Sequence, residues 1–315
     1  MTGFFYRYTL PRPELFILGC GSATPTVYRN PSAQLLRLES TDVLIDCGEG
    51  TQMQLLKYKL KSSRIHSIFI SHLHGDHYLG LPGLLSSMHL LGRKQALHLY
   101  GPKELFEVLD LQFRVSETDL RFELVQHPID CLEKQKIAEL EAFNIYTFPL
   151  NHRIPCFGFQ FVEQPKHGSL KMEMVANYRI PVSELKAIKA GADYRTPDGT
   201  LIPNSLLLKP APLPVSYAYC SDTAYDISVV EAVRQSTWLY HEATFLHALK
   251  DRAVETFHCT ALEAAQVAKE AAVQELIIGH FSSRYRETDD LEAEARSVFK
   301  PSRAAFDGMQ VLLEA

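Results

Sequence analysis

The sequence has no hydrophobic run long enough to cross a membrane. Its longest apolar stretch, Leu79–Leu91, falls short of the roughly 20 residues that a spanning helix needs, and Pro82 and His89 interrupt it. Residues 1–13 contain no apolar run of signal-peptide length. We therefore expect a cytoplasmic protein without a membrane segment.

None of the six cysteines forms a C-x-x-C pair. The neighbours of the cysteines are mostly apolar, so we interpret them as reduced, mainly buried thiols of a cytosolic protein. They are Cys20, Cys47, Cys131, Cys156, Cys220 and Cys259.

The chain also has no excess of positive charge. The formal net charge is -5, with 32 Lys and Arg against 37 Asp and Glu. Bulk positive charge therefore cannot hold a nucleic acid, and any such substrate must be attracted by local patches or by metal ions. The 315 residues are 46% hydrophobic, which is typical of one large or two medium globular domains.

The most informative segment is Ser71–His77, which contains three histidines and one aspartate. It follows the β-prone run Ile68–Ile70 and precedes a stretch that favours a helix. Imidazole and carboxylate are ligands that zinc prefers. Four such groups on one turn cannot all reach one ion comfortably, so two pairs facing two neighbouring ions are expected. The alternative is a chance histidine-rich surface turn.

Strands and helices alternate along the first 104 residues. Predicted strands are 14–18, 33–38, 43–45, 65–70 and 97–100, and predicted helices are 51–58, 84–91 and one from about 101. In the second part, strands are predicted at 145–149, 158–162, 216–220, 238–240 and 275–278, and helices at 227–234 and 260–272. This pattern predicts an α/β protein with two sheets packed face to face and helices outside.

Residues 163–214 differ from the rest, being rich in Lys, Pro and Gly with weak periodicity. Within them, 182–190 is predicted to be helical and 197–199 to be a turn. The segment is either an insertion into the sheet architecture or a plain long connection.

Three further candidate ligands each follow an apolar strand: His152, Asp222 and His280. Strand ends at one edge of a sheet converge in space, although any one of these residues alone is more often an ordinary surface or core side chain. One ion is then expected to be held by His72, His74 and His152. The other is expected to be held by Asp76, His77 and His280. Asp222 can bridge the two ions, and each ion keeps a position open for water. Two ions roughly 3.5–4 Å apart suit in-line displacement at phosphorus.

Two more residues are candidates for proton transfer. Glu242 follows a predicted strand, and His258 precedes a predicted helix. A carboxylate beside a histidine orients its ring and raises its basicity, and a protonated His258 can deliver a proton to a leaving oxygen. The alternative is that Glu242 caps a turn and His258 is a solvated residue at a helix start.

With these residues assembled, the chain resembles the metallo-β-lactamase superfamily and, within it, the ribonuclease Z family of tRNA 3′-processing endonucleases. The resemblance covers nearly the whole chain. Its motifs are Ser71–His77, Asp46–Gln52, Ser221–Thr223, His241–Thr244, His258–Thr260 and Gly279–Tyr285.

The resemblance implies a four-layer αβ/βα sandwich, a homodimer, two zinc ions per chain and the same seven ligands. It gives Asp76 a proton-accepting role and Glu242 with His258 a proton-relay role. The implied reaction removes the 3′ trailer from precursor tRNA, leaving a 3′-hydroxyl on the tRNA and a 5′-phosphate on the trailer. Histidine and carboxylate also accept manganese, iron or cobalt.

The chain departs from the family in two places. The family's substrate loop has a lysine where Val27 stands in Pro25–Asn30. The family's tRNA-gripping arm would correspond to an insertion at about 163–205 in a single domain spanning 1–315. This segment lacks the Gly-Pro hallmark but contains Lys166, Lys171, Lys186 and Lys189.

Three other functions are weighed against this one. A phosphodiesterase of the same superfamily acting on small substrates, such as cyclic nucleotides or aryl diesters, would share the ligands. A metal-holding RNA-binding module without turnover fits less well with the presence of Glu242 and His258. A flavin-linked di-iron oxidoreductase usually has a carboxylate where His74 stands, and nothing here indicates a flavin domain.

Overall fold

The computed structural model describes residues 12–165, 168–211 and 213–314. These residues form two compact units, one made of residues 12–162 and 215–314 and the other of residues 163–214. Within the described residues, no helix combines the length and the apolar character that crossing a bilayer requires.

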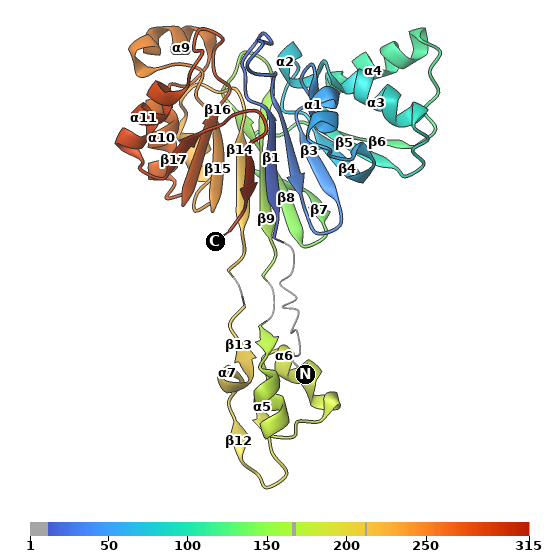
Figure 1. Cartoon of the computed structure of the whole chain (residues 1–315), viewed down its shortest axis with the longest axis vertical. Helices are drawn as coiled ribbons and strands as arrows, with labels where there is room; N and C mark the ends of the chain where they lie inside the picture. The colour runs from blue at the N-terminus through green and yellow to red at the C-terminus, as the bar shows by residue number, and fades with distance from the viewer. Residues whose placement is uncertain (1–11, 166–167, 212, 315) are drawn as a thin grey trace. The chain divides into compact units, whose positions relative to one another are not determined.

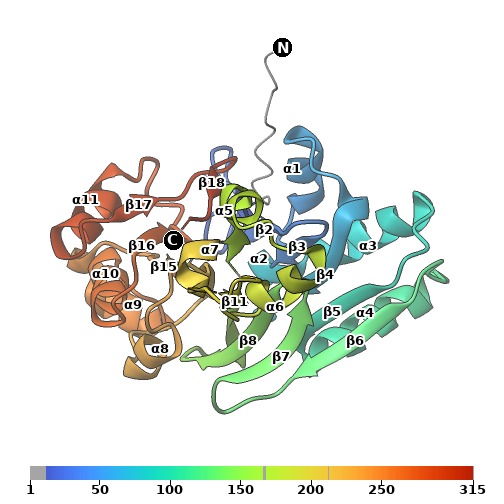
Figure 2. The ribbon, with the colours of Figure 1, turned by 90° about the horizontal axis from the view of Figure 1, so that it is seen from below.

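The larger unit contains two seven-stranded sheets (Figures 1 and 2). The first has the order β18-β1-β2-β3-β4-β5-β6, and β3 to β6 run parallel. Its strands are β1 Glu14–Gly19, β2 Ala33–Arg37, β3 Asp42–Ile45, β4 Ile65–Phe69, β5 Leu97–Pro102, β6 Leu124–Ile129 and β18 Gln310–Leu312.

The second sheet has the order β17-β16-β15-β14-β9-β8-β7, and β14 to β17 run parallel. Its strands are β7 Gln135–Leu140, β8 Phe143–Leu150, β9 Cys156–Glu163, β14 Ser216–Cys220, β15 Trp238–Glu242, β16 Glu275–Gly279 and β17 Ser302–Ala304.

Helices cover the outer faces of both sheets (Figure 1). The first group is α1 Thr51–Lys57, α2 Gly75–Tyr78, α3 Leu81–Leu90 and α4 Lys103–Val115. The second group is α8 Ile227–Ala232, α9 Lys250–Thr256, α10 Ala261–Glu270 and α11 Asp289–Val298. Short 3-10 helices cover Ser62–Arg64 and His247–Leu249.

Two apolar clusters hold these layers together. The inner cluster joins the facing sides of the sheets, where the ring of Phe69 lies 5.3 Å from that of Phe159 and 5.6 Å from that of Phe161. The other packs the opposite side of the first sheet, including Ile68 and Leu99, against its helices. The predicted four-layer αβ/βα sandwich is therefore confirmed.

The strands and helices predicted along the chain are present, with shifted ends. Helix α3 begins at Leu81, one turn before the predicted start, because Pro82 stands in its first turn, where a missing N–H costs nothing. The sheets also contain the unpredicted strands β6, β7, β17 and β18, and the larger unit contains the unpredicted helices α2, α9 and α11.

The smaller unit has a core of its own, built from Ile180, Ile188, Tyr194, Ile202 and Leu207. The helical prediction for 182–190 is confirmed, and the predicted turn at 197–199 joins β11 to β12. Its elements are β10 Ser169–Leu170, α5 Met172–Asn177, a 3-10 turn at Val182–Glu184, α6 Leu185–Lys189, β11 Tyr194–Arg195, β12 Leu201–Ile202, α7 Asn204–Leu207 and β13 Leu208–Lys209. Lys166 lies outside the described residues.

Candidate metal centre

The candidate ligands follow the carboxyl ends of strands from both sheets. His72 and His74 lie in the loop after β4, and Asp76 and His77 lie in α2, which follows at once. The remaining three come from the segments that follow β8, β14 and β16: His152, Asp222 and His280. All seven predicted residues come together in two groups of donor atoms that share Asp222.

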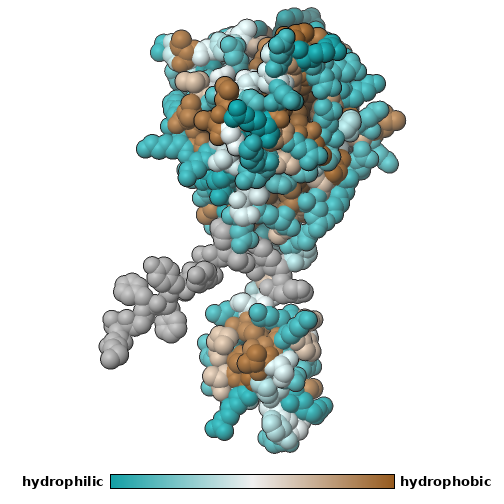
Figure 3. Space-filling view, turned by 90° about the vertical axis from the view of Figure 1, so that its right-hand side faces the viewer, coloured by the Kyte–Doolittle hydropathy of each residue, from teal (hydrophilic) through white to brown (hydrophobic). Residues whose placement is uncertain are grey.

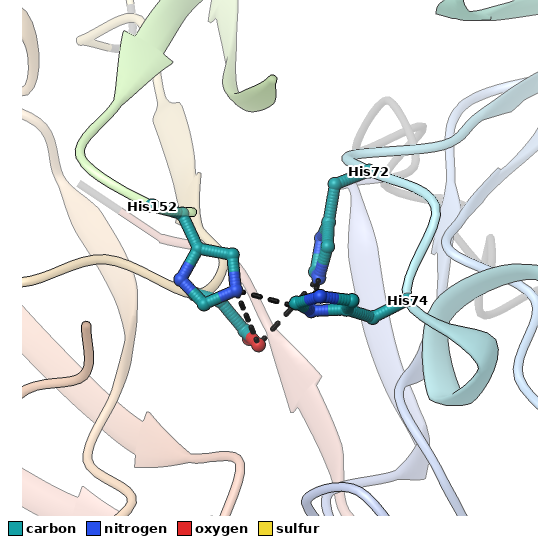
Figure 4. A group of neighbouring side chains, drawn as sticks. His72, His74 and His152 are labelled. Atoms are coloured by element: carbon teal, nitrogen blue, oxygen red, sulfur yellow. Dashed lines mark hydrogen bonds and ion pairs between the residues drawn. The ribbon is translucent and has the colours of Figure 1, made fainter. Parts of the chain in front are cut away.

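In the first group, three imidazoles face one carboxylate oxygen. His74 Nδ1 lies 3.2 Å from His72 Nε2 and 3.1 Å from His152 Nε2. Asp222 Oδ2 lies 3.6 Å from His72 Nε2 and 3.8 Å from His152 Nε2. Figure 4 shows the rings of His72, His74 and His152 converging from two separate segments of the chain.

The second group uses the other oxygen of the same carboxylate. His77 Nε2 and His280 Nε2 are 3.2 Å apart, and Asp222 Oδ1 lies 3.3 and 3.1 Å from them. Asp76 Oδ2 lies 3.4 Å from His77 Nε2 and 3.2 Å from His280 Nε2.

These separations fit divalent ions. A tetrahedral site with metal–nitrogen bonds of about 2.0 Å places its ligands about 3.3 Å apart. Asp222 Oδ1 is buried and makes no hydrogen bond, although an oxygen in that state is normally satisfied. The donor set, the spacing and this unsatisfied oxygen all fit a cation on each side of Asp222.

Four of the five ligand histidines turn their other ring nitrogen to a fixed hydrogen-bond partner, as metal-binding histidines usually do. The four pairs are His72 with Ser71 Oγ at 3.0 Å, His77 with Asp46 Oδ2 at 2.8 Å, His152 with the Phe257 carbonyl at 3.0 Å, and His280 with Thr244 Oγ1 at 3.0 Å. These contacts orient each ring, so the donor atoms converge before any ion binds.

Burial and neighbouring charges act differently on the individual groups of this site. Burial lowers the pKa of His72 to about 4, so this ring is neutral and free to coordinate. Burial also opposes charge on His77, but Asp76 and Asp222 outweigh it and raise the pKa of His77 well above its usual value. Burial raises the pKa of Asp222, but the neighbouring His280 and His77 hold it well below the usual value.

Glu242 and His258 form a buried pair beside the donor atoms. Glu242 ends β15, and its Oε1 accepts hydrogen bonds from His258 Nδ1 and the Cys259 N–H, both at 2.9 Å. The His258 side chain is only 13% exposed, so it is not a solvated residue at a helix start. Burial lowers the pKa of His258, but the charge of Glu242 outweighs it and raises the pKa to about 9. Donor atoms of His258, Asp222 and His280 also lie within 4.8 Å of one another.

Asp46 is the main site residue without a predicted role, although it opens the family motif Asp46–Gln52. It is fully buried after β3, and it accepts hydrogen bonds from the Ser71 N–H at 2.7 Å, Ser71 Oγ at 2.9 Å, His77 Nδ1 at 2.8 Å and the Tyr219 hydroxyl at 2.7 Å. Its position directly after a strand was the available signal, the same one that identified Asp222. Thr244, which joins Glu242 to His280, was also missed.

A cleft of about 330 Å³ opens onto the donor atoms. His74, Asp76, Asp222, His258 and His280 form its base, and residues of the segment 22–31, together with Glu49, Leu79 and Arg153, line its sides. The cleft therefore exposes both donor groups and the ring of His258 to a substrate.

Known proteins resemble this chain in sequence. Residues 13–169 match the family model described as Anti-Pycsar protein Apyc1. The ribonuclease Z of Bacteroides fragilis (strain YCH46) is 44% identical over 300 residues, covering 95% of this chain and 99% of that protein. The ribonuclease Z of Parabacteroides distasonis is 43% identical over 302 residues, covering 95% and 98%.

Solved structures agree in fold. The human tRNase Z, short form, superposes with a TM-score of 0.71 at 29% identity, covering 96% of this chain and 100% of that one. The metallo-β-lactamase fold protein YhfI of Bacillus subtilis gives a TM-score of 0.68 at 19% identity, covering 95% and 99%. With relatives this similar over nearly their whole length, the chain belongs to the ribonuclease Z family, within the metallo-β-lactamase fold.

Proposed function

We propose that this chain is a zinc-dependent, cytoplasmic endoribonuclease that removes the 3′ trailer from precursor tRNA. The products are a 3′-hydroxyl on the tRNA and a 5′-phosphate on the trailer. The observation that carries the proposal is the double donor group that shares Asp222, in a chain 44% identical to a ribonuclease Z over 99% of that protein.

Two zinc ions per chain would be held by the seven donors. His72, His74 and His152 would bind one, Asp76, His77 and His280 the other, and Asp222 both. When bound, such ions activate water for attack and neutralise charge on a transferring phosphoryl group. Metal analysis of protein purified without added metal tests the identity, and another metal near two per chain with little zinc would overturn it.

The chain's own groups handle the protons. Asp76 stays ionised, because its contacts with His77 and His280 outweigh the effect of burial and hold its pKa well below the usual value. It is therefore in the form that accepts a proton from attacking water. His258 turns Nδ1 to Glu242, which leaves Nε2 for the leaving 3′ oxygen. Glu242 holds the ring in place and supports its protonated form.

The segment at about 163–205 is proposed as a substrate-binding insertion in an otherwise single domain of residues 1–315. Its compact unit extends to residue 214 and carries the exposed cations Arg179, Lys186 and Lys189. Exposed cations on a small, separately packed unit suit contact with RNA phosphates.

A homodimer is proposed on the face that carries α1 and α3. A groove of about 560 Å³ lies between these helices, and Met53, Leu56, Leu90 and Leu91 at or beside it are 65–80% exposed. Figure 3 shows apolar surface mixed with polar surface on this side of the unit. Light scattering after size exclusion should give a dimer that Leu56→Asp converts to monomer. The control Leu132→Asp, at a leucine that is 95% exposed outside the groove, should leave it intact.

The decisive experiment is incubation with several precursor tRNAs, with and without a chelator. We expect metal-dependent cleavage next to the discriminator base. A high rate on a small aryl phosphodiester with none on any precursor would instead establish the small-substrate phosphodiesterase.

A further inference from the structure

The cleft has an unusual charge distribution for a site that takes a phosphodiester. Its acidic lining residues are Glu49, Asp76 and Asp222. Among the lining residues, all of which lie in the described part of the chain, Arg153 is the single lysine or arginine. An anionic substrate that enters therefore meets one permanent positive charge from the protein.

Arg153 is exposed, and no hydrogen bond or ion pair of its guanidinium is found among the described residues. Elsewhere in the larger unit, arginines of similar exposure pair with carboxylates, as Arg234 does with Glu231 and Arg296 with Glu292. The five donors of Arg153 are thus available in a fork that matches phosphate geometry.

The backbone around Arg153 is tied to the metal-centre loops. The Asn151 N–H donates to Thr223 Oγ1 at 3.1 Å, and the Asn151 carbonyl accepts from the Ala224 N–H at 2.9 Å. His152, the next residue, is held by the Phe257 carbonyl. The backbone that carries Arg153 is therefore anchored directly after the candidate ligand His152.

We infer that Arg153 binds a non-bridging oxygen of the scissile phosphate and positions that phosphate over the donor groups. The inference rests on the proposed phosphodiester hydrolysis. The alternative is that Arg153 is an ordinary solvated arginine at the rim of the cleft. Its place next to His74 among the residues that line the cleft, and the lack of any other lysine or arginine among them, favour the phosphate-binding role.

The test compares Arg153→Gln and Arg153→Lys with the control Arg234→Gln, which removes the same charge outside the cleft. We expect kcat/KM of Arg153→Gln to fall roughly 10- to 100-fold, as for a lost charge-assisted hydrogen bond. The fall should be similar on precursor tRNA and on a small aryl phosphodiester. Arg153→Lys should recover part of it, and the inhibition constant for inorganic phosphate should rise in Arg153→Gln. Metal content and thermal stability should stay unchanged.

Each other outcome is decisive. Unchanged kinetics and phosphate inhibition in Arg153→Gln would overturn the inference while the hydrolytic function stood. A loss confined to precursor tRNA would move the contact to another phosphate of the RNA and overturn the scissile assignment. A wild-type protein inactive on both substrates would overturn the proposed function, and the inference with it.

Discussion

Substitution of Asp46 by asparagine tests how the ligand histidines are held. Asp46 lies in the left-handed region with φ of 56°, where asparagine is tolerated and alanine is strained. Asp46→Asn therefore keeps the backbone and the shape, and it removes the charge and one acceptor oxygen. Alanine would confuse these effects with backbone strain.

The size of the effect follows from four hydrogen bonds. In the variant, the amide oxygen can keep the Ser71 N–H, and the hydroxyls of Ser71 and Tyr219 can rotate to accept from the amide. His77 Nδ1 cannot adapt in this way while Nε2 coordinates, so it loses its acceptor. Losing such a partner costs about 10- to 100-fold in metal affinity. A buried unsatisfied group costs about 1–3 kcal/mol of stability.

The assay is competition of the metal-free protein with a chelator of known affinity, together with thermal unfolding. The matched control is Asp42→Asn at the other end of β3, a fully buried aspartate that pairs with Arg37 and Arg64 instead of a histidine. The control should lose stability and keep its metal affinity. Equal metal affinity in wild type and Asp46→Asn, or an equal loss in both variants, would refute the reasoning.

Further predictions concern the groups around the ions. His258→Ala should keep its metal content and slow precursor cleavage by roughly 10²–10⁴-fold, as a positioned acid does, and metal loss would show that it is a ligand. Glu242→Ala should behave in the same way, and the double variant should be little worse than either single one in a kinetic cycle. Asp222→Ala should lose metal as well as activity, because two dications would then repel without the bridging carboxylate; full metal content by elemental analysis would contradict this. Chelation should abolish cleavage, and added zinc should restore it; cleavage that survives dialysis against chelator would argue against metal dependence.

Much of the fold could be predicted because its central strands are short, apolar and separated by clear turns. The segment 275–278 is fully apolar apart from its first residue, and it forms β16 with one residue added. The three-residue strand β18 could not be predicted, because it is defined by pairing with β1, almost 300 residues away. Helix α11 was not predicted because only Leu291 and Ala295 of its ten residues are buried, so its apolar residues show little helical periodicity.

The site shows the same division between local and tertiary signals. The cluster Ser71–His77 could be recognised from the sequence because residue type, order and spacing occur together. The role of Asp46 could not, because it depends on hydrogen bonds with His77 and Tyr219, which are 31 and 173 residues away. Pairing of Glu242 with His258 could be proposed from sequence, whereas the link through Thr244 depends on the loops after β15 and β16 lying side by side.

The position of the centre explains why it does not by itself reveal the substrate. The seven donors follow the carboxyl ends of strands from both sheets, so their positions depend on the scaffold. Any phosphodiester that reaches the cleft meets the same donors and the same His258. We therefore expect discrimination between precursor tRNA and a small diester to come from other residues. The candidates are the cleft segment 22–31 and the proposed substrate-binding insertion at about 163–205. Variants in those segments that lose precursor cleavage and keep hydrolysis of a small diester would separate recognition from chemistry.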